Sequence, residues 1–171
     1  MTRAPPRRRL IGRPTSARGS CAAPDSIIVR PVRRGDLDQI IAIDATVTGL
    51  EKRSYWRSVY RRYGDAEQAG RKFLVADAGG RVVGFVIGEV RDWEFGSPPC
   101  GWVFAIDVRP DIRRSGIGTR LLEAICASFR RAGVRKLRTM LARDNTLILS
   151  FFRSQGMMAG LFIPLEMDLE T

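Results

Sequence analysis

Apolar positions along the chain repeat at two spacings, one typical of strands and one typical of helices. A β-branched run that begins at residue 26 predicts a first strand. Apolar residues at steps of three and four then predict two helices, one with Asp36 as its N-cap and one over residues 50–63. Gly64 is expected to end the second helix. The chain is therefore expected to begin with a strand and two helices.

Three more strands are predicted in the middle of the chain. Glycines between two β-branched runs predict a hairpin, with its turn at Ala78-Gly79-Gly80 and its second strand at 81–90. The run at 102–108 is almost continuously apolar, which is typical of a central strand covered on both faces.

The last third of the chain continues with alternating helices and strands. Apolar spacing predicts a helix at 116–131 and a strand at 134–142. A short helix should follow, capped by Asp144 or Asn145, and a last strand should close the chain at 160–170. The complete order is β-α-α-β-β-β-α-β-α-β, which indicates an α/β fold with a mixed sheet and helices on both faces.

The composition is that of a globular protein with a basic extension. The chain has 171 residues, of which 44% are hydrophobic and 27% charged. Residues 1–24 contain six arginines and no acidic residue, so residues 1–25 are expected to form a basic, disordered tail before a single domain at 26–171. Of the net charge of +11, residues 1–24 carry +6 and residues 25–171 carry +5. This charge favours anionic ligands and does not by itself identify nucleic acid.

Several classes of site are excluded by residues that the chain lacks. Histidine is absent, which excludes Ser-His-Asp and Cys-His catalysis and the commonest metal ligand. The three cysteines, Cys21, Cys100 and Cys126, form no CxxC pair, so neither a zinc site nor a disulfide framework is expected. They suit a reducing cytoplasm, where we expect the protein. No apolar run approaches the roughly 18 residues that span a bilayer, so no membrane partner is expected.

The stretch from Val108 to Leu122, VRPDIRRSGIGTRLL, indicates a phosphate-binding loop between a strand and a helix. A Walker loop would need a lysine between Gly116 and the helix, and the chain has none there. A dinucleotide-binding fingerprint would need a glycine in place of Leu121. The remaining type is RxxGxG, and a solvated surface turn is disfavoured by the flanking strand and helix.

An RxxGxG loop binds a diphosphate through its backbone. N–H groups of the tight turn and the positive end of the following helix converge on the phosphates. Gly116 and Gly118 have no Cβ, which lets the backbone approach the ligand. Arg113, Arg114 and Arg120 are expected to add charged donors at the rim.

The motif IDVRPDIRRSGIGTRLL resembles the acetyl-CoA signature of the GNAT superfamily of N-acetyltransferases. IIVRPVRRGDLDQIIAID resembles the first strand and helix of that family, and DNTLILSFFRSQGM resembles its closing element, N-x-x-A-x-x-F-Y-x-x-x-G-F. The resemblance covers residues 26 to about 160. It implies a mixed, mostly antiparallel central sheet of about six to seven strands with helices on both faces.

The resemblance also implies the cosubstrate and the residues that hold it. Acetyl-CoA would donate an acetyl group directly to a primary amine of a protein, peptide or small molecule. Main-chain groups of Ile106, Asp107 and Val108 would contact the pantetheine arm, and an N–H near Val108 would stabilise charge on the thioester oxygen. Asn145 would hold the far end of acetyl-CoA, or cap its helix. The residues implied around the pyrophosphate are Arg113, Arg114, Ser115, Gly116, Ile117, Gly118 and Thr119.

The chain departs from the family where a general base is expected. Met140 and Trp102 stand where two branches of the family carry a glutamate. The remaining candidates are Glu89, Asp92 and Glu94, and Glu94 is preferred because its aromatic neighbours could raise its pKa. For each of these carboxylates, a solvated or ion-paired surface position is the alternative that the sequence favours over a base.

The general acid is also open, because Phe152 stands where the family often has a tyrosine. A thiol with a pKa near ~8.5 can leave without a general acid. Water could otherwise supply the proton, as could a hydroxyl group of the chain. The candidate hydroxyls are those of Ser150, Ser154, Tyr55, Tyr60 and Tyr63.

The acceptor and the assembly are less defined by the sequence. Tyr55, Trp56, Trp93 and Phe95 indicate either core packing or a site for a peptide or an aryl-bearing amine. A weakened, CoA-binding or nucleic-acid-associated regulatory module is the alternative function. The arginine-rich tail lacks aromatic residues, so only nonspecific nucleic-acid binding is expected of it. A homodimer is possible.

Overall fold

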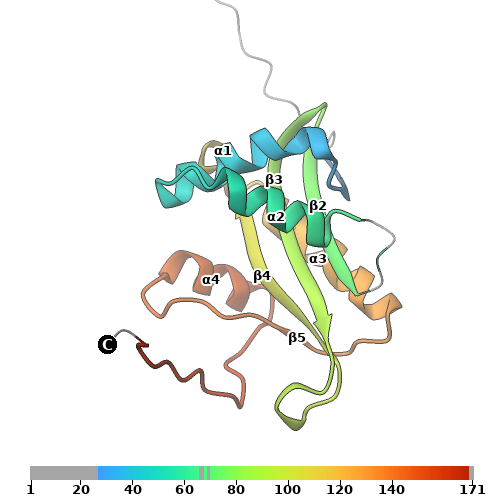
Figure 1. Cartoon of the computed structure of the whole chain (residues 1–171), viewed down its shortest axis with the longest axis vertical. Coiled ribbons are helices and arrows are strands. Elements are labelled where there is room, and N and C mark those ends of the chain that lie inside the picture. The colour runs from blue at the N-terminus through green and yellow to red at the C-terminus, as the bar shows by residue number, and fades with distance from the viewer. Residues whose placement is uncertain (1–26, 66–67, 69, 170–171) are drawn as a thin grey trace, which may run out of the picture.

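A computed structural model describes residues 27–65, 68 and 70–169, and these contain a five-stranded sheet in the order β1-β2-β3-β4-β5 (Figure 1). The strands are β1 (Ile27–Pro31), β2 (Arg71–Ala78), β3 (Arg81–Arg91), β4 (Cys100–Val108) and β5 (Leu137–Arg138). Neighbouring strands are antiparallel except β4 and β5, which are parallel. The predicted mostly antiparallel sheet is therefore confirmed.

Helices cover both faces of this sheet, as predicted. The helices are α1 (Leu37–Thr48), α2 (Arg53–Tyr63), α3 (Ile117–Arg131) and α4 (Thr146–Ser154), with short 3-10 turns η2 (Arg34–Asp36), η3 (Glu94–Gly96) and η4 (Pro110–Ile112). Figure 1 shows α1 and α2 in front of the sheet and α3 behind it. The front helices and the sheet bury one apolar cluster around Phe85, and α3 and α4 bury a second around Leu121.

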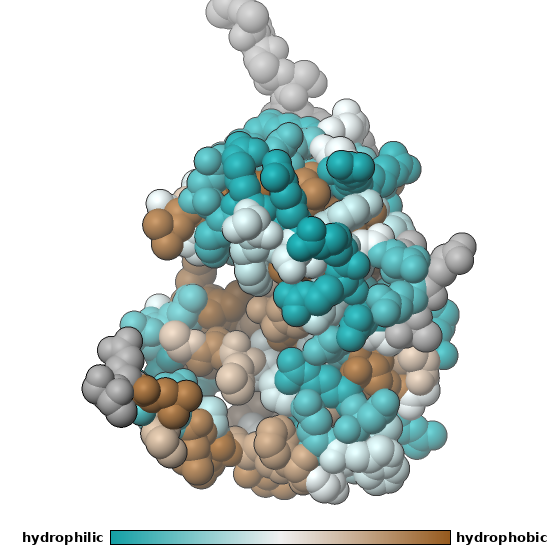
Figure 2. Space-filling model, viewed as in Figure 1, coloured by the Kyte–Doolittle hydropathy of each residue, from teal (hydrophilic) through white to brown (hydrophobic). Residues whose placement is uncertain are grey.

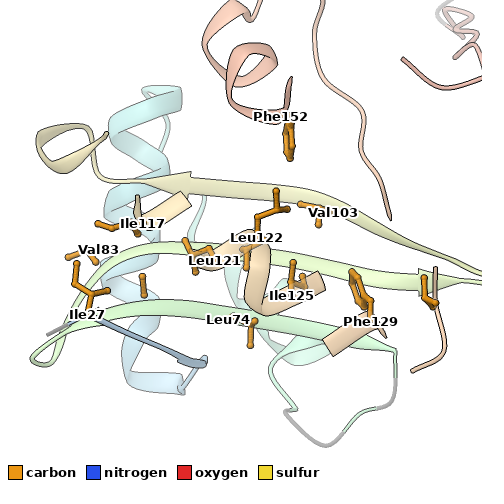
Figure 3. Close-up of a cluster of buried hydrophobic side chains, with 13 residues drawn as sticks. Ile27, Leu74, Val83, Val103, Ile117, Leu121, Leu122, Ile125, Phe129 and Phe152 are labelled. Atoms are coloured by element: carbon orange, nitrogen blue, oxygen red, sulfur yellow. The ribbon is translucent and has the colours of Figure 1, made fainter. Parts of the chain in front are cut away.

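The second cluster joins α4 to the sheet and to α3 (Figure 3). Leu121, Leu122 and Ile125 line the buried side of α3, at the helical spacing that the sequence predicts. Phe152 points from α4 toward this cluster and is only 4% exposed. Packing against α3 therefore positions α4, the helix that follows β5.

The predicted hairpin and two of the predicted helix ends are confirmed. Gly79 and Gly80 have φ values of 64° and 89°, and both form the turn between β2 and β3. Gly133 has φ 79° and follows the end of α3, while Gly64 follows the end of α2. Glycine accepts positive φ without the strain that a Cβ causes, which made the turns at Gly79, Gly80 and Gly133 predictable, whereas Gly64 has φ −78°.

The expected sheet of six to seven strands is wrong for the described residues, which contain five. Residues 159–169 form no strand, and β5 has two residues where nine were predicted. Leu161 and Leu165 are more than 90% exposed in this C-terminal segment. Alternating apolar residues predict a strand, but a strand also needs a hydrogen-bonding partner, and Pro164 has no N–H to donate.

Asp36 stands at the N-cap position of α1, but its carboxylate does not cap the helix. It accepts hydrogen bonds from the guanidinium of Arg30 at 2.7 and 2.9 Å and from the N–H of Arg33 at 2.6 Å. Arg30 also donates to Asp77 at 2.8 Å. This buried ion cluster joins β1, the turn before α1, and β2. Because the Asp36 carboxylate binds Arg30, it does not make the predicted N-cap hydrogen bond to α1.

The predicted basic tail lies outside the described residues. Within the described part of the chain, no helix has both the length and the apolar character needed to cross a bilayer.

Candidate functional site

The parallel strands β4 and β5 separate soon after they begin. Their register joins only Gly101 with Leu137 and Trp102 with Arg138. The rest of β4, as far as Val108, therefore has no strand partner on that side among the described residues. Figure 2 shows this face of the molecule hollowed between the α1–α2 region and the α4 region, with hydrophobic residues in the recess.

A β-bulge sets which backbone groups of β4 face this open edge. Ile87 pairs with Ala105 and Gly88 with Val103, so Phe104 is an extra residue in β4. The N–H of Arg109 donates to the carbonyl oxygen of Val83 in β3 at 3.0 Å. The N–H groups of successive residues in a strand point to opposite sides. The N–H groups of Ile106 and Val108 consequently point away from β3, toward the open edge. Two N–H donors are therefore available next to β4.

The N-terminus of α3 lies at the end of this open edge. Gly116 is its N-cap residue with φ 77°, and no side chain caps the helix. A Cβ on Gly116 would meet no atom within 4 Å, so the turn is open on that side. The first N–H groups of a helix have no acceptor within the helix, and here they lie beside the exposed Arg113 and Arg114. This arrangement fits a diphosphate.

Gly118 and Arg120, two residues of the predicted loop, also contact other elements of the fold. A Cβ on Gly118 would lie 3.1 Å from the ring of Phe151, so the glycine lets α4 approach α3. The guanidinium of Arg120 donates to the carbonyl oxygen of Ile27 at 2.5 Å, on β1. Arg113 and Arg114 are exposed beside the turn, and Arg120 uses one guanidinium N–H on β1. The role of all three arginines at a phosphate stays a prediction.

Asn145 is the N-cap of α4, as one of its two predicted roles requires. Its side-chain oxygen accepts a hydrogen bond from the N–H of Ile148 at 3.2 Å. The side chain is exposed, and its amide N–H groups are not part of this cap. Asn145 can thus cap α4 and still donate to a ligand; its contact with acetyl-CoA stays a prediction.

Asp107 is a half-buried carboxyl group on the open part of β4. The apolar side chains of Ile106 and Val108 pack with α3, so Asp107 between them faces α1 and α2. Desolvation by burial raises its pKa to about 6, and the nearby carboxylate of Asp44 adds to the rise, while Arg113 and Lys52 oppose it.

Asp107 differs from the fully buried carboxylates of the protein. Asp44 accepts hydrogen bonds from Trp56 at 2.9 Å and Lys52 at 3.0 Å, and Asp36 and Asp77 both accept from Arg30. Asp107 has neither a hydrogen bond nor an ion pair with any described side chain. Buried carboxylates are normally paired, so an unpaired one is a candidate functional group.

We expect Asp107→Asn to stabilise the protein at pH 7.5. The pKa of Asp107 is raised in the folded state, so ionising this group is less favourable there than in the unfolded chain. The free energy of unfolding therefore falls as pH rises from about 4 to about 6. Removing that charge should add on the order of 2 kcal/mol at pH 7.5 and almost nothing at pH 4. Thermal denaturation at both pH values measures this, and equal or lower melting temperatures for the variant at pH 7.5 would contradict it.

The two predicted bases, Glu89 and Glu94, are both ion-paired. Glu89 accepts from the hydroxyl of Tyr63 at 2.9 Å and from Arg91 at 3.0 Å, opposite Trp102 in the β3–β4 register. Glu94 lies 3.7 Å from Arg91. The structure brings these carboxylates to the paired end of β4, away from the edge with the free N–H groups. Their role as a base stays a prediction.

The hydroxyl candidates for a general acid are spread around the site. Tyr63 is next to the bulge, because its ring centre lies 5.2 Å from that of Phe104. Desolvation raises the pKa of Tyr63, and the hydrogen bond to Glu89 adds to the rise. Tyr55 instead stacks edge-on against Trp56, and Ser154 donates to a carbonyl within α4. Tyr63 is therefore the candidate that the fold places beside β4.

The aromatic residues predicted for substrate binding fall into two groups. Trp56 is 2% exposed and packs on Phe85, so it belongs to the core. Tyr55, Trp93 and Phe95 are between 44% and 75% exposed. Sequence reasoning assigned Asp107 only a main-chain role; an acidic residue within an apolar central strand was the signal for its side chain.

Comparison with known proteins identifies the family. Residues 39–157 match the family described as Acetyltransferase (GNAT) family. The chain is 33% identical over 87 residues to L-2,4-diaminobutyric acid acetyltransferase of Nocardia farcinica, covering 51% of this chain and 44% of that protein. It is 32% identical over 83 residues to mycothiol acetyltransferase of Pseudarthrobacter chlorophenolicus, covering 48% and 26% respectively. The chain therefore spans less than half the length of these relatives.

Solved structures show the same fold. The structure of the aminoglycoside N-acetyltransferase AAC(6')-Iy in complex with CoA has a TM-score of 0.72 and 17% identity, covering 84% of this chain and 95% of that one. A Trypanosoma brucei acetyltransferase has a TM-score of 0.63 and 22% identity, covering 84% and 99%. The matched residues include β2, β3, β4 and α3, which form the open edge and the uncapped helix. The chain belongs to the GNAT family of acetyltransferases.

Proposed function

We propose that the protein is an acetyl-CoA-dependent N-acetyltransferase that transfers the acetyl group directly to a primary amine. One observation carries this proposal: the open edge of β4 ends at the uncapped N-terminus of α3. A pantetheine arm is an extended chain with amide groups, so it can bond to the unpaired backbone of β4 as a strand would. A pyrophosphate carries the negative charge that the N–H groups beside Gly116 and the arginines Arg113 and Arg114 favour.

Bound acetyl-CoA would supply an activated acyl carbon. The N–H group of Val108 then stabilises the negative charge that develops on the thioester oxygen when an amine attacks, while that of Ile106, about 7 Å away along the strand, can bond to the pantetheine arm. The thiol product has an ordinary pKa near ~8.5, so it can leave with little help. Tyr63 next to Phe104 is the chain's own candidate to protonate it, although its hydroxyl donates to Glu89 in this structure.

Binding and catalysis can be tested separately. We expect acetyl-CoA to raise the melting temperature of the protein, since it binds the folded state; no rise at millimolar concentration would contradict the site. We expect at least one primary amine to increase release of free thiol from acetyl-CoA. The panel should contain L-2,4-diaminobutyrate, an aminoglycoside and a short peptide with a free N-terminus. Binding without thiol release by any amine would favour the alternative, a CoA-binding regulatory module.

A further inference from the structure

We propose that Asp107 is the general base of this enzyme, which takes a proton from the ammonium group of the acceptor; this rests on the proposed acetyltransferase function. The assignment follows from position. Asp107 lies between Ile106 and Val108, whose N–H groups face the open edge of β4. The side chains of Ile106 and Val108 lie on the α3 face of the sheet, so that of Asp107 lies on the opposite face, toward α1 and α2. An amine that approaches the thioester from the α1–α2 side meets this carboxylate beside the reacting carbon.

The surroundings of Asp107 leave it free to bind a cation. No described side chain bonds to it, whereas Glu89 is bonded by Tyr63 and Arg91. The charged groups that face Asp107 are Asp44 from α1, Lys52 from the segment between α1 and α2, and Arg113 from the loop after β4. Lys52 is already bonded to Asp44 at 3.0 Å. Arg113 donates to the carbonyl oxygen of Val108 at 3.2 Å. Both neighbouring cations therefore have other acceptors, and an entering ammonium group can pair with Asp107.

A pocket lies just beyond this end of β4, close to Asp107 in the chain but not lined by it. It opens between α1 and the segment that directly follows the strand. It is lined by Ala42, Ile43, Thr46, Arg109, Pro110 and Asp111. Its walls combine apolar atoms with charged groups, as expected for a site that holds a small molecule by its polar end.

The proton and electron changes balance without a further reactant. The Asp107 carboxylate takes one proton from the ammonium group, and the freed nitrogen lone pair forms the C–N bond. The C–S bond breaks and its electrons go to sulfur. The nitrogen, now bonded to the acetyl group, loses its second proton to that thiolate, which leaves as the thiol. Asp107 then returns its proton to solvent.

The first measurement uses the wild-type protein and the panel amine that gives the most thiol release. At saturating acetyl-CoA, kcat/KM should fall tenfold for each pH unit below a midpoint near the pKa of Asp107, about 6. Because no variant is involved, this result does not depend on whether a substitution folds. A profile with no inflection between pH 5 and 7 would overturn the assignment.

The second measurement compares variants at pH 7. Asp107→Asn should lower kcat/KM by about 100-fold or more. The tenfold fall in kcat/KM per pH unit below about pH 6, which we call the acid limb, should disappear. Its thermal shift with acetyl-CoA should equal that of the wild type, because the main chain of β4 is unchanged. Activity should recover toward the wild-type value near pH 9 to 10, where the amine loses its proton unaided. A purely structural role for Asp107 would not produce this recovery.

Matched variants separate the possible outcomes. Asp38→Asn removes a carboxylate from α1 that is 84% exposed, and its kinetics should equal those of the wild type. Glu89→Gln and Glu94→Gln should keep the acid limb. Wild-type kinetics for Asp107→Asn, or the loss of that limb in a glutamate variant instead, would overturn the proposal. A wild-type protein that is inactive with every amine would instead refute the acetyltransferase function itself.

Discussion

Gly116→Trp is expected to abolish the thermal stabilisation that acetyl-CoA gives to the wild-type protein. Gly116 has φ 77°, and the space where its Cβ would lie is open for 4 Å, so an indole there would occupy the proposed diphosphate site. At a concentration 100 times its Kd, a ligand stabilises a protein by about 2.7 kcal/mol, or about 5–10 °C for a chain of this size. The variant should show a shift below about 1 °C, measured by thermal denaturation with and without acetyl-CoA.

Gly79→Trp is the matched control for this experiment. Gly79 also has a positive φ, of 64°, and open space around it, but it lies in the turn between β2 and β3. Both substitutions force a left-handed backbone on a residue with a Cβ, which costs roughly 1–2 kcal/mol. Both variants should therefore start from a lower melting temperature, and only Gly116→Trp should lose the response to acetyl-CoA. An equal response in the two variants would exclude this turn from the binding site.

Arg30→Met is expected to cause a large loss of stability at a position away from the site. Arg30 is the shared partner of Asp36 and Asp77, and the three side chains are only 8–12% exposed. Removing one partner of a buried ion pair leaves an uncompensated charge and costs about 3–5 kcal/mol. Here two carboxylates would be left. Urea denaturation at pH 7 should show this loss in the free energy of unfolding. Thermal denaturation should show a melting temperature lower by about 10 °C.

The pH dependence and a control distinguish this cluster from a surface pair. Desolvation opposes ionisation of Asp36, but hydrogen bonds from Arg30 and from the N–H of Arg33 outweigh it and lower the pKa. Stability from a lowered pKa is present above about pH 4 and is lost as pH falls further, so the variant and the wild type should converge in acid. Arg53→Met removes an exposed pair with Asp38 and should leave the stability almost unchanged. Equal losses for the two arginines would refute the buried-charge explanation.

Local patterns were enough to predict the elements that depend on neighbouring residues. The turn at Gly79 and Gly80 follows from glycine's tolerance of positive φ, and α3 follows from apolar residues at helical spacing. The C-terminal segment shows the limit of such patterns. Its alternation predicted a strand, but residues 159–169 have no strand partner in the structure. A strand is stabilised by hydrogen bonds to another strand, which its own sequence does not contain.

Side-chain roles near the site were harder to predict, because residues distant in sequence decide them. Arg120 was expected at the phosphates, and one of its guanidinium N–H groups donates to the carbonyl oxygen of Ile27. Gly118 was expected to admit a ligand, which stays a prediction, and the structure adds that it leaves room for the ring of Phe151. In each case the partner lies on an element that local spacing does not place.

The sequence by itself determined the loop around Gly116, the order of the elements up to α4, and hence the family. These depend on backbone preferences and apolar periodicity, which act over a few residues. The tertiary structure alone decided that the bulge at Phe104 turns two N–H groups to an open edge, and that Asp107 is half-buried beside Asp44. The ionisation of a carboxyl group depends on the solvent and charges around it, and only the folded chain brings α1 and β4 together.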